Sequence, residues 1–156
     1  MGTTIIFVET PSGKKRDVLC RWVEHFYEAG NKIQVSVDST IAAQHIDQLL
    51  WTFSQGSFIP HKIVSGSDAV NILEPVAIKA DEKWLEGFQV LIADGSFSLH
   101  SMNKCGTAVH FVLLDDPEKR QESRLLWQAA KERGFQLRHV PYSASPKSIA
   151  HAGMGT

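Results

Sequence analysis

Hydrophobic residues follow two different periods along this chain, and the two periods alternate from one segment to the next. Short apolar and β-branched runs, typical of buried strands, occur at 4–8, 32–37, 88–93, 108–114 and 135–140. Longer stretches with apolar residues at helical spacing occur at 14–29, 40–53 and 116–133. This alternation predicts a three-layer α/β domain, in which a mainly parallel sheet has helices on both faces.

The remaining segments give weaker signals. Residues 76–78 are expected to form a short strand, and the polar residues 95–106 a loop or a short turn of helix. From residue 143 onward, Ser, Ala, Gly and Pro dominate the composition, which is typical of a weakly held tail. We therefore expect a single domain over residues 1–142 and a C-terminal tail over residues 143–156.

The most informative helical stretch is 116–133. Asp116 is a good N-cap, and Gly134 is an expected stop. At 100° per residue, the apolar residues Leu125, Leu126, Ala129 and Ala130 gather on one side, which we expect to face the core. The opposite side gathers Arg120, Arg124, Trp127 and Lys131. The simplest interpretation is a solvated amphipathic helix, but a large aromatic side chain within a basic stripe favours a binding face for an acidic, aromatic partner.

Charge and composition limit the classes of partner. The 156 residues are 43% hydrophobic and 21% charged, as in ordinary globular proteins, and the formal net charge is −1. Residues 117–139 carry a net charge of +3, so the rest of the chain carries −4. Bulk electrostatics therefore do not predict a nucleic-acid-binding protein. The two cysteines, Cys20 and Cys105, are far apart and predict no disulfide framework, which fits a cytoplasmic protein. We expect neither a signal peptide nor a membrane-spanning segment.

Sequence signatures of enzymes and cofactor sites are missing. The first strand is followed by ETPSGKKRD, which fits neither G-x-G-x-x-G nor the P-loop pattern. Gly13 before two lysines is compatible with a phosphate site, although a plain turn explains it better. The seven histidines form no H-x-x-x-H pair, and the Asp115-Asp116 pair is explained as a turn and a helix cap. We expect no catalytic site, no metal and no cofactor.

The run from Leu50 to His61, LWTFSQGSFIPH, resembles the L-W-x(5)-S-F-[VI]-P-H segment of the chi subunit of bacterial DNA polymerase III. Residues 75–78, PVAI, are similar to that family's P-V-x-I strand, and the helix at 116–133 followed by GFQL is a third match. The three matches come in the family's order. The resemblance implies a Rossmann-like fold and a non-enzymatic accessory subunit of the clamp loader, without nucleotide chemistry.

The resemblance also implies partners and site residues. The family binds the acidic C-terminal tail of single-stranded DNA-binding protein, which ends in an aromatic-rich tip. The matching positions predict a tail-binding site that consists of Arg120, Arg124, Trp127, Leu113 and Trp51. His139, on the closing strand beside this helix, is expected at the edge of the site. Some members also bind a second accessory subunit, psi, and Phe58, Pro60 and His61 are the candidate residues for this contact.

Two other functions are compatible with the sequence. The first is a small-molecule or nucleotide-binding α/β domain, because parallel sheets bind ligands beyond the carboxyl ends of their strands. The second is direct binding of single-stranded nucleic acid, with bases stacked on Trp127.

Overall fold

The computed structural model describes residues 2–53, 58–65 and 72–146. The strands are β1 (Thr4–Thr10), β2 (Ile33–Val37), β3 (His61–Ile63), β4 (Val76–Lys79), β5 (Val90–Asp94), β6 (Thr107–Leu113) and β7 (Gln136–Val140). The helices are the short 3₁₀ helix η1 (Ser12–Lys14), α1 (Lys15–Glu28), α2 (Thr40–Thr52), α3 (Leu99–Met102) and α4 (Pro117–Glu132). The predicted alternation of strands and helices is confirmed.

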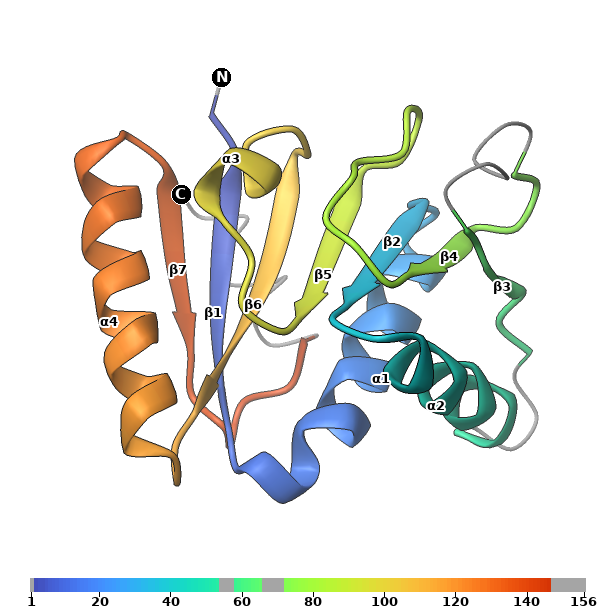
Figure 1. The fold of residues 1–156 in the computed structure, drawn as a ribbon, viewed down its shortest axis with the longest axis horizontal. Helices are drawn as coiled ribbons and strands as arrows, with labels where there is room; N and C mark the ends of the chain where they lie inside the picture. The colour runs from blue at the N-terminus through green and yellow to red at the C-terminus, as the bar shows by residue number, and fades with distance from the viewer. Residues whose placement is uncertain (1, 54–57, 66–71, 147–156) are drawn as a thin grey trace.

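All seven strands form one sheet in the order β3-β4-β2-β5-β6-β1-β7, and every described pairing is parallel (Figure 1). The 88–93 run supplies the central strand, and the 135–140 run supplies the edge strand β7. The predicted mainly parallel sheet is therefore confirmed, and it is parallel throughout the described residues.

Helices cover both faces of the sheet, which gives the expected three layers. One core lies between the sheet and α1 and α2, around Trp22, Leu19 and Ile46. The other lies between the sheet and α3 and α4, around Phe7, Met102 and Ala130. Strand residues alternate between the two cores, because successive side chains of a strand point to opposite faces. Figure 1 shows α4 beside β7 at one end of the sheet and α2 near β3 at the other.

The helix boundaries follow local capping chemistry. The Ser39 side chain accepts a hydrogen bond from the backbone N–H of Ala42 at the start of α2, and the Asp116 side chain accepts one from Lys119 at the start of α4. Gly134 follows α4 with a φ of 84°, a left-handed conformation that glycine adopts without a steric penalty. The predicted N-cap and stop of this helix are both confirmed.

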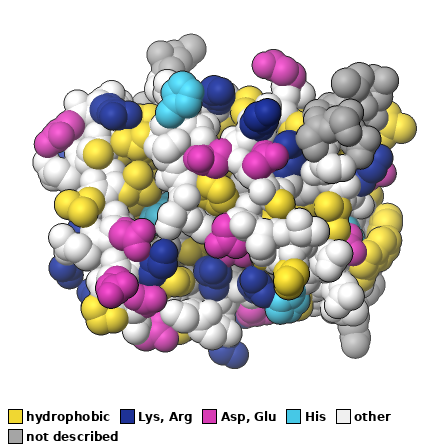
Figure 2. Space-filling model, viewed as in Figure 1, with side chains coloured by type: hydrophobic (Ala, Val, Ile, Leu, Met, Phe, Trp, Pro, Cys, Tyr) yellow, Lys and Arg dark blue, Asp and Glu magenta, His cyan; other side chains and the backbone are white. Residues whose placement is uncertain are grey.

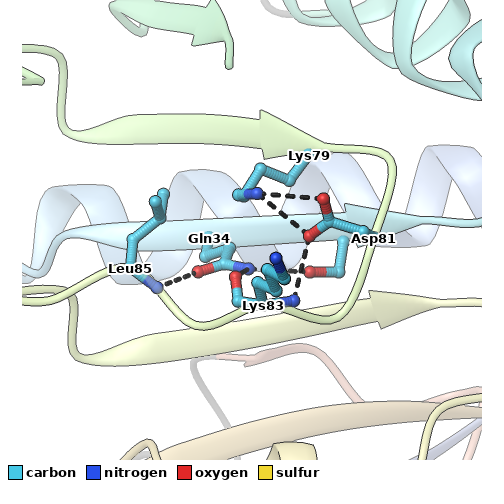
Figure 3. A network of polar contacts seen from close by, with 6 residues as sticks. Gln34, Lys79, Asp81, Lys83 and Leu85 are labelled. Atoms are coloured by element: carbon cyan, nitrogen blue, oxygen red, sulfur yellow. Dashed lines mark hydrogen bonds and ion pairs between the residues drawn. The ribbon is translucent and has the colours of Figure 1, made fainter. Parts of the chain in front are cut away.

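A buried polar network fixes the connection between β4 and β5 (Figure 3). The Lys79 amine is almost fully buried and donates to both carboxylate oxygens of Asp81, at 3.0 and 3.1 Å. Gln34 on β2 donates to the Lys83 carbonyl and accepts from the Leu85 N–H. Burial raises the pKa of Asp81, but the hydrogen bonds from Lys79 and Lys83 outweigh it and hold the pKa below its usual value. The network satisfies a charge that would otherwise be costly to bury.

Two local predictions need correction. Strand β3 was not expected, because three residues are too few to show a period, and its parallel pairing with β4 defines it. Leu125 was expected in the core but is 62% exposed. Ser123 and Ala130 are the buried residues of α4, and Leu125 lies about 200° around the helix from Ser123. Small residues at these two positions allow the helix to lie close to the sheet.

The start of the predicted tail is ordered against the domain. Ala144 packs on the core beneath α1 and α2, and its backbone N–H donates to the Pro141 carbonyl. The rest of the tail, residues 147–156, lies outside the described residues, as does the 54–57 part of the LWTFSQGSFIPH segment.

Candidate functional site

A groove of about 390 Å³ lies between α4 and the strands β1, β6 and β7. Its lining is mixed, with aromatic, aliphatic and charged side chains: Phe7, Glu9, Val112, Arg120, Ser123, Arg124, Trp127, Gln128 and His139. Four of the six residues predicted for the tail-binding site are therefore brought together here.

Helix α4 supplies the basic and aromatic side of the groove. Arg120, Arg124 and Trp127 are spaced by four and three residues and so lie in line along the helix. Both guanidinium groups are exposed, and no carboxylate of the described residues lies within ion-pair distance of either. They are available to bind an acidic ligand.

Trp127 is less exposed than the helical pattern suggested. Its ring packs against Phe7 in an edge-to-face arrangement, with the ring centroids 4.9 Å apart, and belongs to the rim of the second core. Aromatic pairs favour this geometry, which keeps the indole in one orientation. The groove therefore has a fixed apolar surface next to its two arginines.

The strands supply the floor. Phe7 and Glu9 are two residues apart on β1 and face the same side, and His139 lies opposite Phe7 on β7. A His139 ring nitrogen lies 3.0 Å from the Glu9 carboxylate. Phe7 and Glu9 were missed at the sequence level. Glu9 had a detectable signal, because it is a charged residue at the end of a buried strand, on the same face as Phe7.

Leu113 does not reach this groove. It ends β6 and packs against the core beneath α1 and α2, on the opposite face of the sheet. Val112, its neighbour, lines the groove. The prediction was wrong by one residue, and in a strand a shift of one residue moves the side chain to the other face.

Trp51 is also separated from α4. It lies on α2, where its ring centroid is 5.3 Å from that of Phe58 and 4.6 Å from that of His61. Trp51, Trp127 and Leu113, which were predicted for one tail-binding site, are therefore not brought together. Helices α2 and α4 cover opposite faces of the sheet.

The Trp51 side of the molecule forms a second candidate surface. Trp51 and Phe58 are 56% and 60% exposed, although they contact each other, whereas Ile59 between Phe58 and Pro60 is buried. His61 is buried, and its ring nitrogens face the Ile59 carbonyl at 2.7 Å and the Asp47 carboxylate at 3.1 Å. The histidine therefore ties this segment to α2, while the two large rings remain at the surface.

Another hollow, of about 240 Å³, lies at the carboxyl ends of the central strands, where an α/β domain would place a small ligand. Its lysines are already paired: Lys15 lies 2.6 Å from the buried Asp94 carboxylate, and Lys119 lies 3.3 Å from Glu122. Lys15 is also one of the two lysines of the phosphate site considered at Gly13. Its ion pair with Asp94 makes it less available to a phosphate there.

Other expectations concern the residue chemistry. Cys20 and Cys105 are buried free thiols, and burial raises their pKa values to about 12 and about 11.

Over the described ranges, no group of three His, Cys, Asp or Glu side chains is placed to hold a metal ion. Asp116 caps α4, and Asp115 accepts hydrogen bonds from the backbone and side chain of Ser12. Hydrogen bonds from Ser12 lower the pKa of Asp115, so both aspartates have structural partners.

The fold and the groove define an α/β domain of the three-layer, parallel-sheet class, with a groove lined by two arginines and an indole beside its last helix. The model of the family described as DNA polymerase III chi subunit, HolC, matches residues 2–138. The chain belongs to this family. No curated protein matches the sequence with significance.

Family membership establishes the general role. Members of the chi subunit family are non-catalytic accessory subunits of DNA polymerase III, and membership implies association with the clamp-loader complex. The chain therefore has an accessory role in DNA replication. In the part of the chain that the structure describes, no helix has the length and apolar character that crossing a bilayer requires.

Proposed function

We propose that the groove beside α4 binds the acidic C-terminal tail of single-stranded DNA-binding protein, and that the chain thereby couples the clamp loader to coated single strands in the cytoplasm. The observation that carries the proposal is the pair Arg120 and Arg124, free of described carboxylate partners, next to the ring of Trp127. Guanidinium groups bind carboxylates through charge-assisted hydrogen bonds, and the indole offers a surface for a terminal aromatic ring.

Direct binding of single-stranded DNA is less well supported. Figure 2 shows Asp and Glu side chains close to the Lys and Arg side chains on the face it draws. A nucleic-acid backbone needs several phosphate contacts in a row, whereas Arg120 and Arg124 are the arginines that line this groove. A short acidic peptide with an aromatic end requires only the two arginines and the apolar surface.

The test is calorimetric titration of a tail peptide into the wild-type protein, Arg124→Ala and Trp127→Ala. A hydrogen bond to a charged group is worth about 1.5–3 kcal/mol, so Arg124→Ala should weaken binding roughly 10- to 100-fold. Trp127→Ala should weaken it comparably, as should removal of the terminal aromatic residue from the peptide. Affinity should also fall with salt, because the arginines are exposed.

Arg133→Ala is the matched control, because it removes an exposed arginine at the end of α4 that does not line the groove. Its affinity should equal that of the wild type. The melting temperature of Trp127→Ala shows whether loss of its contact with Phe7 has unfolded the domain. Equal peptide affinities for the wild type, Arg124→Ala and Arg133→Ala would place the tail elsewhere.

We also propose that Trp51 and Phe58 form the contact with a second clamp-loader partner, such as a psi-like subunit, with Pro60 and His61 holding the segment in place. Large exposed aromatic side chains are the residues that most often anchor protein interfaces. The buried Ile59 and the His61–Asp47 contact fix the backbone on both sides of Pro60. The backbone that follows Phe58 is thus held in place, which lowers the entropic cost of binding.

A further inference from the structure

Glu9 stands out in the proposed tail-binding groove. It is the one carboxylate among the described side chains that line the groove, which also include the guanidinium groups of Arg120 and Arg124. Its side chain is 31% exposed, so the carboxylate reaches solvent and a ligand at this position.

The Glu9 carboxylate does not neutralise the arginines. Its Oε2 atom lies 3.0 Å from Nε2 of His139, and the described ion pairs include none between Glu9 and Arg120 or Arg124. His139 thus holds the carboxylate on the strand side of the groove, while the guanidinium groups project from the helix side. A ligand in the groove meets both charges.

The fold does not require a negative charge here. Glu9 lies near the end of β1, where its backbone pairs with Val112 on β6, and its side chain is partly exposed to solvent. Glutamine has the same shape and can still contact His139. The negative charge of Glu9 therefore affects ligand binding in the groove more than it affects the stability of the fold.

We infer that Glu9 is a specificity-determining residue of this groove, which limits its affinity for acidic ligands. The inference rests on the proposed tail-binding function. A fixed negative charge opposes each additional carboxylate of an approaching acidic segment, so the groove holds a ligand through the few acids that reach the arginines. Binding is correspondingly weaker, and longer polyanions gain little.

The experiment compares wild-type protein, Glu9→Gln, Glu9→Asp and Glu86→Gln by stopped-flow and calorimetric titration with the acidic tail peptide. At about 0.05 M salt, Glu9→Gln should bind about 3- to 10-fold more tightly, mostly through a faster association rate. The difference should shrink at about 0.5 M salt, where exposed charges are screened. Glu9→Asp keeps the charge and should stay within about twofold of the wild type.

Glu86→Gln is the matched control, because it makes the same change in net charge on an exposed residue between β4 and β5, outside the groove lining. It should match the wild type. If Glu9→Gln binds no more tightly than the wild type while Arg124→Ala still weakens binding, this inference is wrong and the proposed function survives. If the wild type does not bind the peptide, both are wrong. Equal tightening in Glu9→Gln and Glu86→Gln would assign the effect to net charge and also overturn the inference.

Discussion

His110 lies between the groove beside α4 and the hollow at the carboxyl edge of the sheet. One ring nitrogen is 2.8 Å from the Ser123 hydroxyl, and Ser123 lines both spaces. The His110 ring also packs edge-to-face with Phe7, which makes the same kind of contact with Trp127. The remaining ring nitrogen is buried without a hydrogen-bond partner in the described structure. A positive charge on this ring would therefore be poorly solvated.

Stability should depend on the neutral form of His110. Burial lowers the pKa of His110 from 6.5 to about 4, with Glu122 opposing the shift. Because the unfolded chain then binds this proton more readily than the folded chain, the free energy of unfolding falls as the pH drops from about 6.5 toward 4. Between pH 8 and pH 5 the loss should be about 2 kcal/mol.

Urea unfolding of the wild type and His110→Gln at both pH values measures this contribution. The variant should lose about 2 kcal/mol less than the wild type over this range, whatever its stability at pH 8. His100→Gln, which removes an exposed histidine on α3, is the control and should behave as the wild type. The same pH dependence in all three proteins would rule out His110 as its source.

At the scale of elements, α4 places both arginines and the indole, so its first turn controls the groove. The Asp116 carboxylate accepts the Lys119 N–H at 3.1 Å, and Arg120 follows directly. Asp116→Ala should lower the free energy of unfolding by about 1 kcal/mol. The substitution leaves the Lys119 N–H without its acceptor and removes the favourable negative charge at the start of the helix. Asp116→Asn keeps a capping oxygen and should lose markedly less. Thermal unfolding of the two variants gives the comparison, and equal losses would mean that the side-chain cap contributes nothing.

Periodicity predicted the elements well and the orientation of single side chains less well. The bounds, caps and sheet class followed from the sequence because each depends on local spacing and on turn chemistry. Leu113 was assigned from the family resemblance, which gave no orientation for its side chain, and alternation along β6 places Val112 rather than Leu113 in the groove. The error at Leu125 has a different cause, since the small residues Ser123 and Ala130 set the rotation of α4.

Trp51 shows a different limit. The family resemblance gave it a role but no position in space, and the sheet order then placed α2 far from α4. By contrast, Arg120, Arg124, Trp127 and His139 were predicted together and lie together, because three of them share one helix face and β7 follows that helix directly. Residues from a single supersecondary unit are the ones that a sequence can group.

At the scale of the whole molecule, the sheet order separates the two proposed contact surfaces. Strand β3 lies next to the Trp51–Phe58 surface, and strand β1 forms the floor of the groove. The two strands are five strand spacings apart, or roughly 24 Å across the sheet. The surfaces also lie on helices that cover opposite faces (Figure 1). This separation exceeds the Debye length of about 8 Å at physiological ionic strength, so charges at one surface act weakly on the other.

The two surfaces should therefore bind independently and at the same time. Phe58→Ala should weaken binding to the second clamp-loader partner about 5- to 30-fold, as expected for loss of 1–2 kcal/mol at an aromatic anchor, and leave the affinity for the tail peptide unchanged. Arg124→Ala should have the reverse effect. Leu125→Ala, which shortens an exposed apolar side chain on α4, is the control and should leave the partner affinity unchanged. Titration of each ligand in the presence and absence of the other measures the coupling. A Phe58→Ala protein that melts normally but loses both ligands would show that the two surfaces are one site.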